Sequence, residues 1–479
     1  MASLRDGRRI IHDGEQIEDV TTHPDFAWCA SAVAQFYDFQ SDPAARDVMT
    51  YQTPDGTTAG TAFMEPQTQE DLRRRATAHA TWAEVTCGFM GRSPDYMNTC
   101  LATIAGVSRA LAESDPATSE RARRLYLTAR DDDLAYTHTF AEPFKVATSN
   151  QPSCRIVRET SDGIVVSGAR ILATLAPFCN MNLDLPGSVA YERNGASHAL
   201  GFVVPVNADG ITWLMRESVV STRTPRSDSL SGRMDEMDCI AILDECLIPW
   251  DQVYVVMPDD IRLPWFPLMM AGLHHHVVLR AIAKTRFMVG LAHLLAESSR
   301  VNRFTNVQER LGEMATILHT MEAFAMAAVE GAIYSEDAKQ LFPHPKTVET
   351  AVTMFGHFHE TLVSHIYDVA GSRLMSCPHE RTVDLASDVV EQYFRGSTTS
   401  GHDNIALHRL AWDVTGSSWG SRQDLYERFH FGNTTMRRLS AYASLDKEQV
   451  TSAVRRVLSQ PPDRTTGRVW PLPNPRSSG

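Results

Sequence analysis

Three long helix-type segments in the C-terminal half of the chain constrain the fold most. The segments HHHVVLRAIAKTRFMVGLAHLLAES, NVQERLGEMATILHTMEAFAMAAVEGAIY and TVETAVTMFGHFHETLVSHIYDVAG each exceed 20 residues. Helices of this length bury their apolar faces by packing side by side. Residues 263–455 are therefore predicted to form a four-helix-type bundle, followed by a tail over 456–479 whose Pro, Arg and Ser content favours an extended or partly disordered arm.

A β-rich region precedes these helices. Asp162-Gly163 and Asp209-Gly210 each separate two β-type runs, which is the sequence signal of a hairpin. Residues 141–262 are therefore predicted to form a mostly antiparallel, β-barrel-like domain, and residues 1–140 an N-terminal helical domain. The predicted fold class is α+β, and the order of the three regions matches the architecture of the acyl-CoA dehydrogenases.

Composition excludes several classes of function. The chain has 479 residues and a net charge of −13 without a basic stripe, which argues against nucleic-acid binding. No apolar run of about 18 residues indicates a membrane span, and the charged N-terminus has no secretory h-region, so a cytoplasmic enzyme is expected. The eight cysteines form no CxxC pair and are expected to be buried thiols.

The stretch FMGRSPDYMNTC places Arg92 and Tyr96 one helical turn apart, around a Ser93-Pro94 pair typical of a helix start. One interpretation is structural, with Arg92 bound to a carboxylate and Tyr96 packed in the core. The other is a paired anchor, because a guanidinium and a phenol one turn apart can hold a single anionic oxygen. His138, in the segment LAYTHTF, has either a structural role or a proton-transfer role at the same oxygen.

Two further segments are compatible with a cofactor. The run ARILATLAPF is either a buried strand or a surface that lines a flat cofactor with Thr174 and nearby amides. The segment GSSWGSRQDLYERFHFGN is either a surface loop or a cradle for a phosphate at a helix start. The triplet His274 to His276 predicts no metal site, because adjacent histidines on a helix point in different directions.

These segments together resemble the oxygenase component of 4-hydroxyphenylacetate 3-monooxygenase and its relatives, which are two-component, reduced-flavin-dependent aromatic hydroxylases with the acyl-CoA dehydrogenase-like fold. The resemblance runs through most of the chain and rests on six segments in family order. These segments are DGEQIEDVTTHPDF, GRSPDYMN, LAYTHTF, VRETSDGIVVSGARILATLAP, SGRMDEMDCIAILDECLIPWDQVYV and LAWDVTGSSWGSRQDLYERFHFG.

The resemblance assigns roles to individual residues. It implies that Arg92, Tyr96 and His138 bind the phenolic oxygen and are the catalytic residues. It also implies that His276 lies near the reactive flavin carbon, although His274 and His275 stay open as alternatives. The other implied flavin-binding residues are Thr174, Leu175, Gly416, Ser417, Ser418, Gly420, Arg422 and Gln423.

The activity implied is hydroxylation of a phenol ortho to its hydroxyl, through a flavin C4a-hydroperoxide formed from FADH2 and O2. FAD is expected over FMN only through the family. A separate NAD(P)H:flavin reductase is the implied partner, because no nicotinamide fingerprint occurs in the chain, and the family implies a homotetramer. The alternatives are a flavoprotein similar to 4-hydroxybutyryl-CoA dehydratase, which would need iron–sulfur ligands, or to an acyl-CoA dehydrogenase, which would need a glutamate base.

Two departures from the family bear on the ligands. Phe144 stands where relatives usually carry a glutamine, which puts one flavin contact in question. The loop YERNGASH differs from that of the phenylacetate enzymes at the place where the far end of their substrate is held, and Ser197 in this loop is expected to bind the substrate. The substrate is therefore expected to be another phenol, either free or tethered to a carrier protein.

Overall fold

The computed structural model describes residues 1–141, 143, 154–185, 190–193, 196–222, 224, 226–258, 266–430, 432 and 434–459. The chain divides into two compact units, Met1–His430 and Phe431–Gly479. Within the described residues, the second unit consists of helices α14 (Thr434–Ala443) and α15 (Lys447–Ser459). The predicted tail overlaps the end of α15, and its remaining residues, 460–479, lie outside the described part of the chain.

The first unit contains the helices α1 (Ala27–Ser41), α2 (Arg46–Met49), α3 (Gln69–Val85), α4 (Pro94–Ser108), α5 (Pro116–Asp131), α6 (Ser231–Met234), α7 (Phe266–Ser298), α8 (Thr305–Glu330), α9 (Pro345–Ala370), α10 (Glu380–Leu385), α11 (Ser387–Tyr393), α12 (Gly401–Thr415) and α13 (Ser418–Phe429). Its strands are β1 (Ile10–His12), β2 (Glu15–Ile17), β3 (Thr50–Gln52), β4 (Thr58–Gly60), β5 (Tyr136–Thr139), β6 (Arg155–Glu159), β7 (Gly163–Ile171), β8 (Met181–Asp184), β9 (Ala190–Arg193), β10 (Ala196–Pro205), β11 (Ile211–Met215), β12 (Cys239–Pro249), β13 (Val253–Pro258), β14 (Ile333–Ser335) and β15 (Gln340–Phe342).

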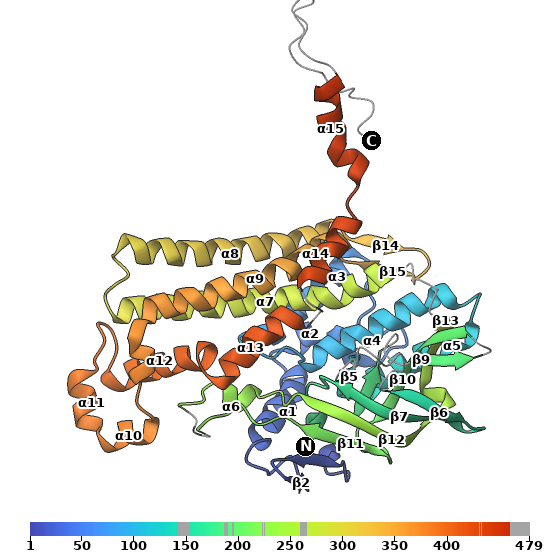
Figure 1. The fold of residues 1–479 in the computed structure, drawn as a ribbon, viewed down its shortest axis with the longest axis horizontal. Coiled ribbons are helices and arrows are strands. Elements are labelled where there is room, and N and C mark those ends of the chain that lie inside the picture. The colour runs from blue at the N-terminus through green and yellow to red at the C-terminus, as the bar shows by residue number, and fades with distance from the viewer. Residues whose placement is uncertain are drawn as a thin grey trace, which may run out of the picture. The chain divides into compact units, whose positions relative to one another are not determined.

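The three long helices expected from the sequence are α7, α8 and α9, which pack against one another and lie side by side in Figure 1. Helix α12 packs on α7 and α9, and α13 packs on α9. Helix α9 shows why the sequence predicts these helices. Its buried residues recur at spacings of three and four, and they include Val348, Val352, Phe355, His359 and Leu362. Apart from His359, the buried residues of this face are apolar or glycine, and they pack α9 against the other long helices.

The main sheet has eleven strands in the order β2-β1-β11-β12-β7-β6-β9-β10-β8-β5, with β13 paired to β10. Most neighbours are antiparallel, as predicted, whereas β1–β11, β6–β9 and β5–β8 are parallel. Strands β1 and β5 come from the region 1–140, which was predicted to be helical. They are only three and four residues long, too short to give a periodic signal.

The sheet corrects the expectation of a barrel-like domain. Among the described strands the path runs from β2 to β5 without closing, so the sheet is open. The hairpin predicted at Asp162-Gly163 is confirmed, because β6 and β7 pair in antiparallel fashion across it. The hairpin predicted at Asp209-Gly210 is wrong, because β11 pairs with β12 and β1. The carbonyl of Gly210 accepts the Asp244 N–H of β12 at 2.8 Å, so this turn packs on β12.

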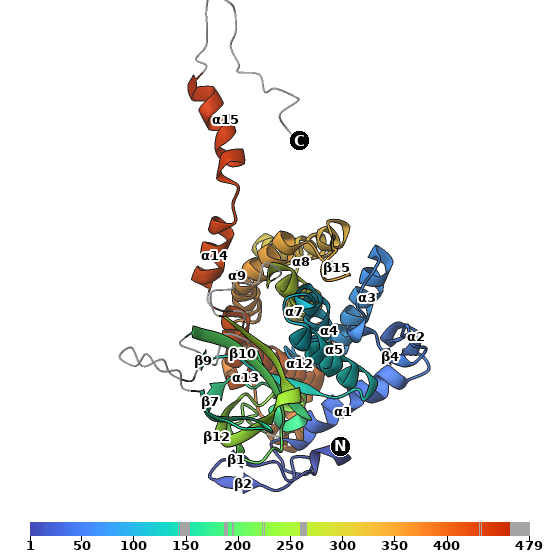
Figure 2. The ribbon, with the colours of Figure 1, turned by 90° about the vertical axis from the view of Figure 1, so that its right-hand side faces the viewer.

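Helix α4 links the two layers of the first unit. It packs on α7 on one side and on α5 and β5 on the other, and Figure 2 shows α4 and α5 between the long helices and the sheet. All residues of α4 are buried. Its N-terminus therefore lies inside the unit, where groups from the sheet and from the helices meet.

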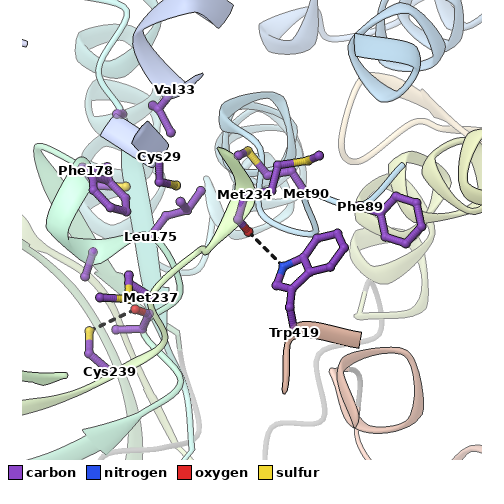
Figure 3. Packing of buried hydrophobic residues seen from close by; sticks show 14 of the residues in the cluster. Cys29, Val33, Phe89, Met90, Leu175, Phe178, Met234, Met237, Cys239 and Trp419 are labelled. Atoms are coloured by element: carbon purple, nitrogen blue, oxygen red, sulfur yellow. Dashed lines mark hydrogen bonds between the residues drawn. The ribbon is translucent and has the colours of Figure 1, made fainter. Parts of the chain in front are cut away.

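A continuous apolar core fills the space around this N-terminus. Figure 3 shows Trp419 of α13 beside Phe89, with its indole N–H donating to the Met234 carbonyl at 3.4 Å. Leu175 and Phe178 extend the same core toward the sheet. The core thus joins α13, the segment before α4 and the turn after β7 in one packed region.

Two other expectations concern the whole chain. Of the eight cysteines, Cys87 and Cys377 are partly buried and the other six are buried, which fits the expectation for the thiols. In the part of the chain that the structure describes, no helix is both long enough and apolar enough to cross a membrane.

Candidate active site

The first turn of α4 carries the residues that the sequence singles out. Ser93 occupies the N-cap position and Pro94 the first helical position, as predicted. The Ser93 hydroxyl does not cap the helix, however, and instead donates to Asp95 Oδ1 at 2.6 Å. Because the whole turn is buried, its polar groups bond to one another instead of to water.

Arg92, Tyr96 and His138 come together at this turn. The guanidinium carbon of Arg92 lies 4.3 Å from the centre of the Tyr96 ring, and the centroids of the Tyr96 and His138 rings are 5.9 Å apart. His138 is carried by β5, which contacts α4. A cation, a phenol and an imidazole from two segments thus form one cluster, in which Arg92 and Tyr96 are buried and His138 is partly buried.

Burial sets the protonation of this cluster. Removal from water raises the pKa of the Tyr96 hydroxyl, against the opposing effect of the Arg92 charge. Removal from water and the Arg92 charge together lower the pKa of His138 to about 3, so its imidazole is neutral at pH 7. His138 Nδ1 is buried and has no hydrogen-bond partner within the described residues. A buried nitrogen of this kind suits a ligand hydroxyl.

Glu236 connects the cluster to two of the predicted flavin-binding residues. Its carboxylate accepts the backbone N–H of Arg92 at 2.7 Å and Nη1 of Arg422 at 2.6 Å. Its carbonyl accepts the N–H of Leu175 at 2.8 Å. Leu175 has a φ of 65°, a left-handed conformation that costs energy for a residue with a side chain and that this hydrogen bond helps to hold.

Asp238 joins the remaining polar groups of the same region. It accepts a bidentate pair from Arg422, Nε at 2.9 Å and Nη2 at 2.7 Å, and the Thr174 hydroxyl at 2.8 Å. Arg216 adds a further bond at 3.0 Å. The Arg422 and Arg216 charges hold the pKa of Asp238 well below its usual range despite its burial. Thr174 and Arg422, which were predicted from segments far apart in sequence, therefore meet on one carboxylate.

The three adjacent histidines have different surroundings, as the helix geometry predicts. His274 Nδ1 lies 2.6 Å from Glu349, and His275 is buried. His276 is the one beside the cluster, with Nε2 3.1 Å from Asp95 Oδ2 and its ring centroid 5.5 Å from that of Tyr96. His276 Nδ1 is buried and has no hydrogen-bond partner among the residues described.

His79, from α3, completes this arrangement. Its Nδ1 lies 2.9 Å from Asp95 Oδ2, so two imidazoles share one carboxylate oxygen. Burial lowers the pKa of His79 to about 4. His276 and His79 together hold the pKa of Asp95 well below its usual range, although Asp95 is buried. The three donor atoms lie within 4.8 Å of one another. His79 Nδ1 and His276 Nε2 both lie at hydrogen-bonding distance from Asp95 Oδ2, at 2.9 and 3.1 Å.

The Gly- and Ser-rich segment forms the start of α13. Ser417 is the N-cap, and its hydroxyl accepts the N–H of Gly420 at 2.9 Å. Ser418 is exposed, and a Cβ on Gly416 would lie 2.5 Å from the Trp412 ring, so this glycine is required by packing. Gln423 donates to the Phe89 carbonyl at 3.1 Å and is directed into the core.

Two positions that the family resemblance connects with ligand binding lie partly or wholly outside the described structure. Ser197 lies in β10 opposite Glu192 of β9, and its side chain is outside the described part of the structure. Phe144 lies outside the described residues altogether.

Sequence reasoning missed several residues that bond to the cluster or to the predicted flavin-binding residues. They are His79, Asp95 as a hydrogen-bond acceptor, Glu236, Asp238, and Tyr426, whose hydroxyl accepts a hydrogen bond from Arg92. The available signal was the run Asp235 to Asp238, which places three carboxylates directly before the apolar strand β12. Carboxylates are rarely buried unless they are paired, so this run pointed to cationic partners inside the fold. The identity of those partners depends on tertiary contacts.

The fold first defines a class. The chain superposes on the acyl-CoA dehydrogenase of Geobacillus kaustophilus with a TM-score of 0.51 at 14% identity, covering 86% of this chain and 97% of that one. It superposes on the oxygenase component of 4-hydroxyphenylacetate 3-monooxygenase complexed with FAD and 4-hydroxyphenylacetate with a TM-score of 0.89 at 31% identity, covering 96% and 97%. The class is the acyl-CoA dehydrogenase-like flavoprotein fold.

Sequence comparison then gives the family. The N-terminal region of 4-hydroxyphenylacetate 3-hydroxylase matches residues 1–255, and the C-terminal region matches residues 269–459. The oxygenase component of 4-hydroxyphenylacetate 3-monooxygenase from Thermus thermophilus is 33% identical over 463 residues, 94% of each chain. The chain therefore belongs to the 4-hydroxyphenylacetate 3-hydroxylase family.

A relative with a larger substrate is also similar. The (3S)-3-amino-3-(3-chloro-4-hydroxyphenyl)propanoyl-[peptidyl-carrier protein SgcC2] monooxygenase of Streptomyces globisporus is 30% identical over 451 residues, 90% of this chain and 84% of the relative. The relatives thus include one enzyme named for a free phenol and one named for a phenol on a carrier protein.

Proposed function

We propose that the chain is the oxygenase component of a two-component monooxygenase, which uses FADH2 and O2 to hydroxylate a phenol ortho to its hydroxyl. The observation that carries the proposal is the cluster of Arg92, Tyr96 and His138, in which Arg92 and Tyr96 are buried and His138 is partly buried. Family membership supports the same activity, because relatives are named as phenol monooxygenases and one is solved with FAD and a phenol.

The donor set fits a flavin and an aromatic hydroxyl. His138 Nδ1 and His276 Nδ1 are buried without a partner in the described residues. The centroids of the two imidazole rings lie 5.9 and 5.5 Å from that of the Tyr96 ring. Thr174, Leu175 and the start of α13 would hold the cofactor, and Arg422 would support them from Asp238. When bound, reduced FAD supplies the electrons that activate O2.

The chain's own residues act on the phenol. Arg92 stabilises the phenolate, which is more electron-rich than the phenol and therefore reacts better with an electrophilic oxygen. His138 is neutral at pH 7 and accepts a hydrogen bond from the phenol hydroxyl at Nδ1, which orients the phenol oxygen toward Arg92. Because Arg92, Tyr96 and His138 fix the phenol oxygen, they also fix which ring carbon is presented, and hydroxylation falls at the ortho position.

The remaining assignments belong to the same proposal. A separate NAD(P)H:flavin reductase supplies FADH2, the chain works in the cytoplasm as a homotetramer, and the Ser197 region contacts the far end of the substrate. The substrate is a phenol other than 4-hydroxyphenylacetate, either free or carried by a protein. The Streptomyces relative named above supports the carrier-bound alternative.

The test is turnover of a panel of para-substituted phenols with reduced FAD and air, read by mass spectrometry as gain of one oxygen. The panel includes 4-hydroxyphenylacetate, 4-nitrophenol and carrier-bound 4-hydroxyphenyl substrates. The Arg92→Met variant is expected to lose phenol binding and to keep FAD binding, because Met fills similar volume without charge. Arg130→Met, which removes another buried guanidinium that pairs with Asp55 and Asp131, is the matched control. Full hydroxylation by Arg92→Met, or no product from any phenol, would overturn the proposal.

A further inference from the structure

We propose that Tyr426 of α13 is a positioning residue for this reaction, which holds the Arg92 guanidinium in the orientation that receives the phenol oxygen. This inference rests on the proposed function, because it concerns how the proposed phenol anchor is kept in place. Tyr426 lies within the segment assigned to the flavin site, yet its hydroxyl bonds to Arg92, the residue proposed to bind the phenol oxygen.

The contact itself is short and well defined. Arg92 Nη1 donates to the Tyr426 hydroxyl at 2.5 Å, and that hydroxyl donates to the Gly91 carbonyl at 3.0 Å. The Arg92 guanidinium carbon lies 4.3 Å from the centre of the Tyr96 ring and 5.3 Å from that of Tyr426. The guanidinium therefore contacts two aromatic rings, and one of the two also supplies a hydrogen-bond acceptor.

The neighbouring backbone is shaped to admit Tyr426. A Cβ built on Gly91 would lie 2.2 Å from the Tyr426 ring, so no other residue fits at position 91 without displacing that ring. On its other side the ring stacks on His430, with centroids 4.3 Å apart and planes 17° apart. The ring is thus fixed from two directions, and its hydroxyl is placed on Arg92 by packing.

Burial keeps the Tyr426 hydroxyl protonated despite the cations around it. Arg280 and Arg422 also lie over the ring, at 5.4 and 5.0 Å from its centre. Burial raises the pKa of Tyr426 to about 12, against the charges of Arg92 and Arg280, so the hydroxyl stays protonated at neutral pH. A neutral hydroxyl can accept from Arg92 and donate to Gly91 at the same time, which an ionised one cannot.

Helix α13 also ties this contact to the flavin segment. Arg422 lies one turn before Tyr426 on the same face, and Arg422 and the Arg92 backbone are bound to opposite oxygens of Glu236. Arg92 is therefore held twice from α13, by its side chain through Tyr426 and by its main chain through Glu236. Loss of the Tyr426 hydroxyl would remove one hydrogen bond that orients the guanidinium, whereas its contact with the Tyr96 ring and the main-chain bond to Glu236 would stay.

The experiment compares Tyr426→Phe with wild type on the phenol turned over best in the panel. We expect KM for the phenol to rise about tenfold, the effect of losing one hydrogen bond to a charged group, while kcat changes much less. We expect the FAD dissociation constant to stay unchanged, because the ring remains. The ionisation of bound 4-nitrophenol, whose anion absorbs visible light, gives a direct readout of the anchor. Its midpoint is expected about one pH unit higher in Tyr426→Phe.

Two controls separate the possible failures. Tyr126→Phe removes a buried tyrosine hydroxyl that donates to the Phe63 carbonyl at 2.7 Å, so it matches the stability cost without touching the site. Its KM is expected to equal that of wild type. If Arg92→Met abolishes phenol binding while Tyr426→Phe leaves both KM and the nitrophenol midpoint unchanged, this inference fails and the proposed function stands. If Arg92→Met binds phenol normally, the proposed function itself fails. Equal losses of phenol and FAD affinity in Tyr426→Phe would show a general structural role and overturn the inference.

Discussion

Replacement of Glu427 by glutamine tests whether a buried ion-pair network stabilises the packing of α13, the helix that carries Tyr426, on α7. Glu427 accepts two hydrogen bonds from Arg280, both at 2.8 Å, and one from Lys284 at 2.6 Å. The side chains of all three residues are at most 1% exposed. One carboxylate therefore compensates two buried cations on α7 and joins that helix to α13.

The expected cost follows from this geometry. Glu427→Gln leaves the two cations of Arg280 and Lys284 without their shared carboxylate and turns an amide donor toward one of them. Breaking a buried pair by removing one partner typically costs about 3–5 kcal/mol. Lys284→Met keeps the bidentate Arg280–Glu427 pair and removes one cation, so we expect a cost of about 1.5 kcal/mol or less. The double variant is expected to be more stable than Glu427→Gln alone, because only one uncompensated cation remains.

The assay is urea unfolding of wild type, both single variants and the double variant, followed by tryptophan fluorescence at pH 7. The coupling energy from this cycle is expected to exceed about 1 kcal/mol. If Glu427→Gln costs no more than Lys284→Met, or if the two effects add, the shared carboxylate does not hold the two cations and the reasoning is refuted.

The same cycle has a definite pH dependence. Burial lowers the pKa of Lys284 to about 8 even with Glu427 present, so in Glu427→Gln it should fall further. The folded-state pKa of Lys284 is then below its unfolded value, and between the two values the unfolded chain binds more protons. Stability must therefore rise with pH across that window. We expect Glu427→Gln to recover part of its lost stability between pH 7 and about 9, and Lys284→Met/Glu427→Gln to show no such recovery.

Two further predictions address the cofactor and the imidazole. Asp238→Asn weakens the support of Thr174 and Arg422, so the FAD dissociation constant should rise about tenfold in a fluorescence titration, and an unchanged affinity would remove Asp238 from the flavin site. The pKa of His138 falls from 6.5 to about 3 on folding, so the unfolded chain binds the extra proton between these values and stability is lost as pH drops through that window. His138→Gln should therefore show a smaller fall in thermal midpoint from pH 7 to pH 4 than wild type does, and parallel curves would contradict the assignment.

Local patterns predicted the elements that have long or strong signals. The three long helices, the hairpin at Asp162-Gly163 and the helix start at Ser93-Pro94 are where the sequence places them, because apolar periodicity and turn chemistry act over a few residues. The hairpin at Asp209-Gly210 was wrong because its turn packs on β12, a strand about 30 residues further along the chain. The short strands β1 and β5 have no periodic signal of their own, and they are strands because they pair with β11 and β8 of the sheet.

The candidate site divides in the same way. Arg92 and Tyr96 could be predicted as a pair because one helical turn separates them. For His138 and Thr174 the local sequence left a structural and a functional interpretation open, and the family resemblance assigned their roles and that of Arg422. The carboxylates that hold these residues, Asp95, Glu236 and Asp238, act across distances in sequence that no local pattern spans. Glu236, for example, bonds to the backbone of Arg92 and to Arg422 of α13, and both residues lie far from it in the sequence.

The long helices, the adjacency of Arg92 and Tyr96 and the family could all be inferred from the order of residues alone, because they depend on neighbouring residues or on motifs kept in order. The packing of distant segments, by contrast, sets which charges meet. It places His276 of the histidine triplet beside Tyr96 and bonds Tyr426 to Arg92. The physical reason is burial. A charged or polar side chain inside the protein must find its partner in space, and the fold, not the order of residues, determines which partner is within reach.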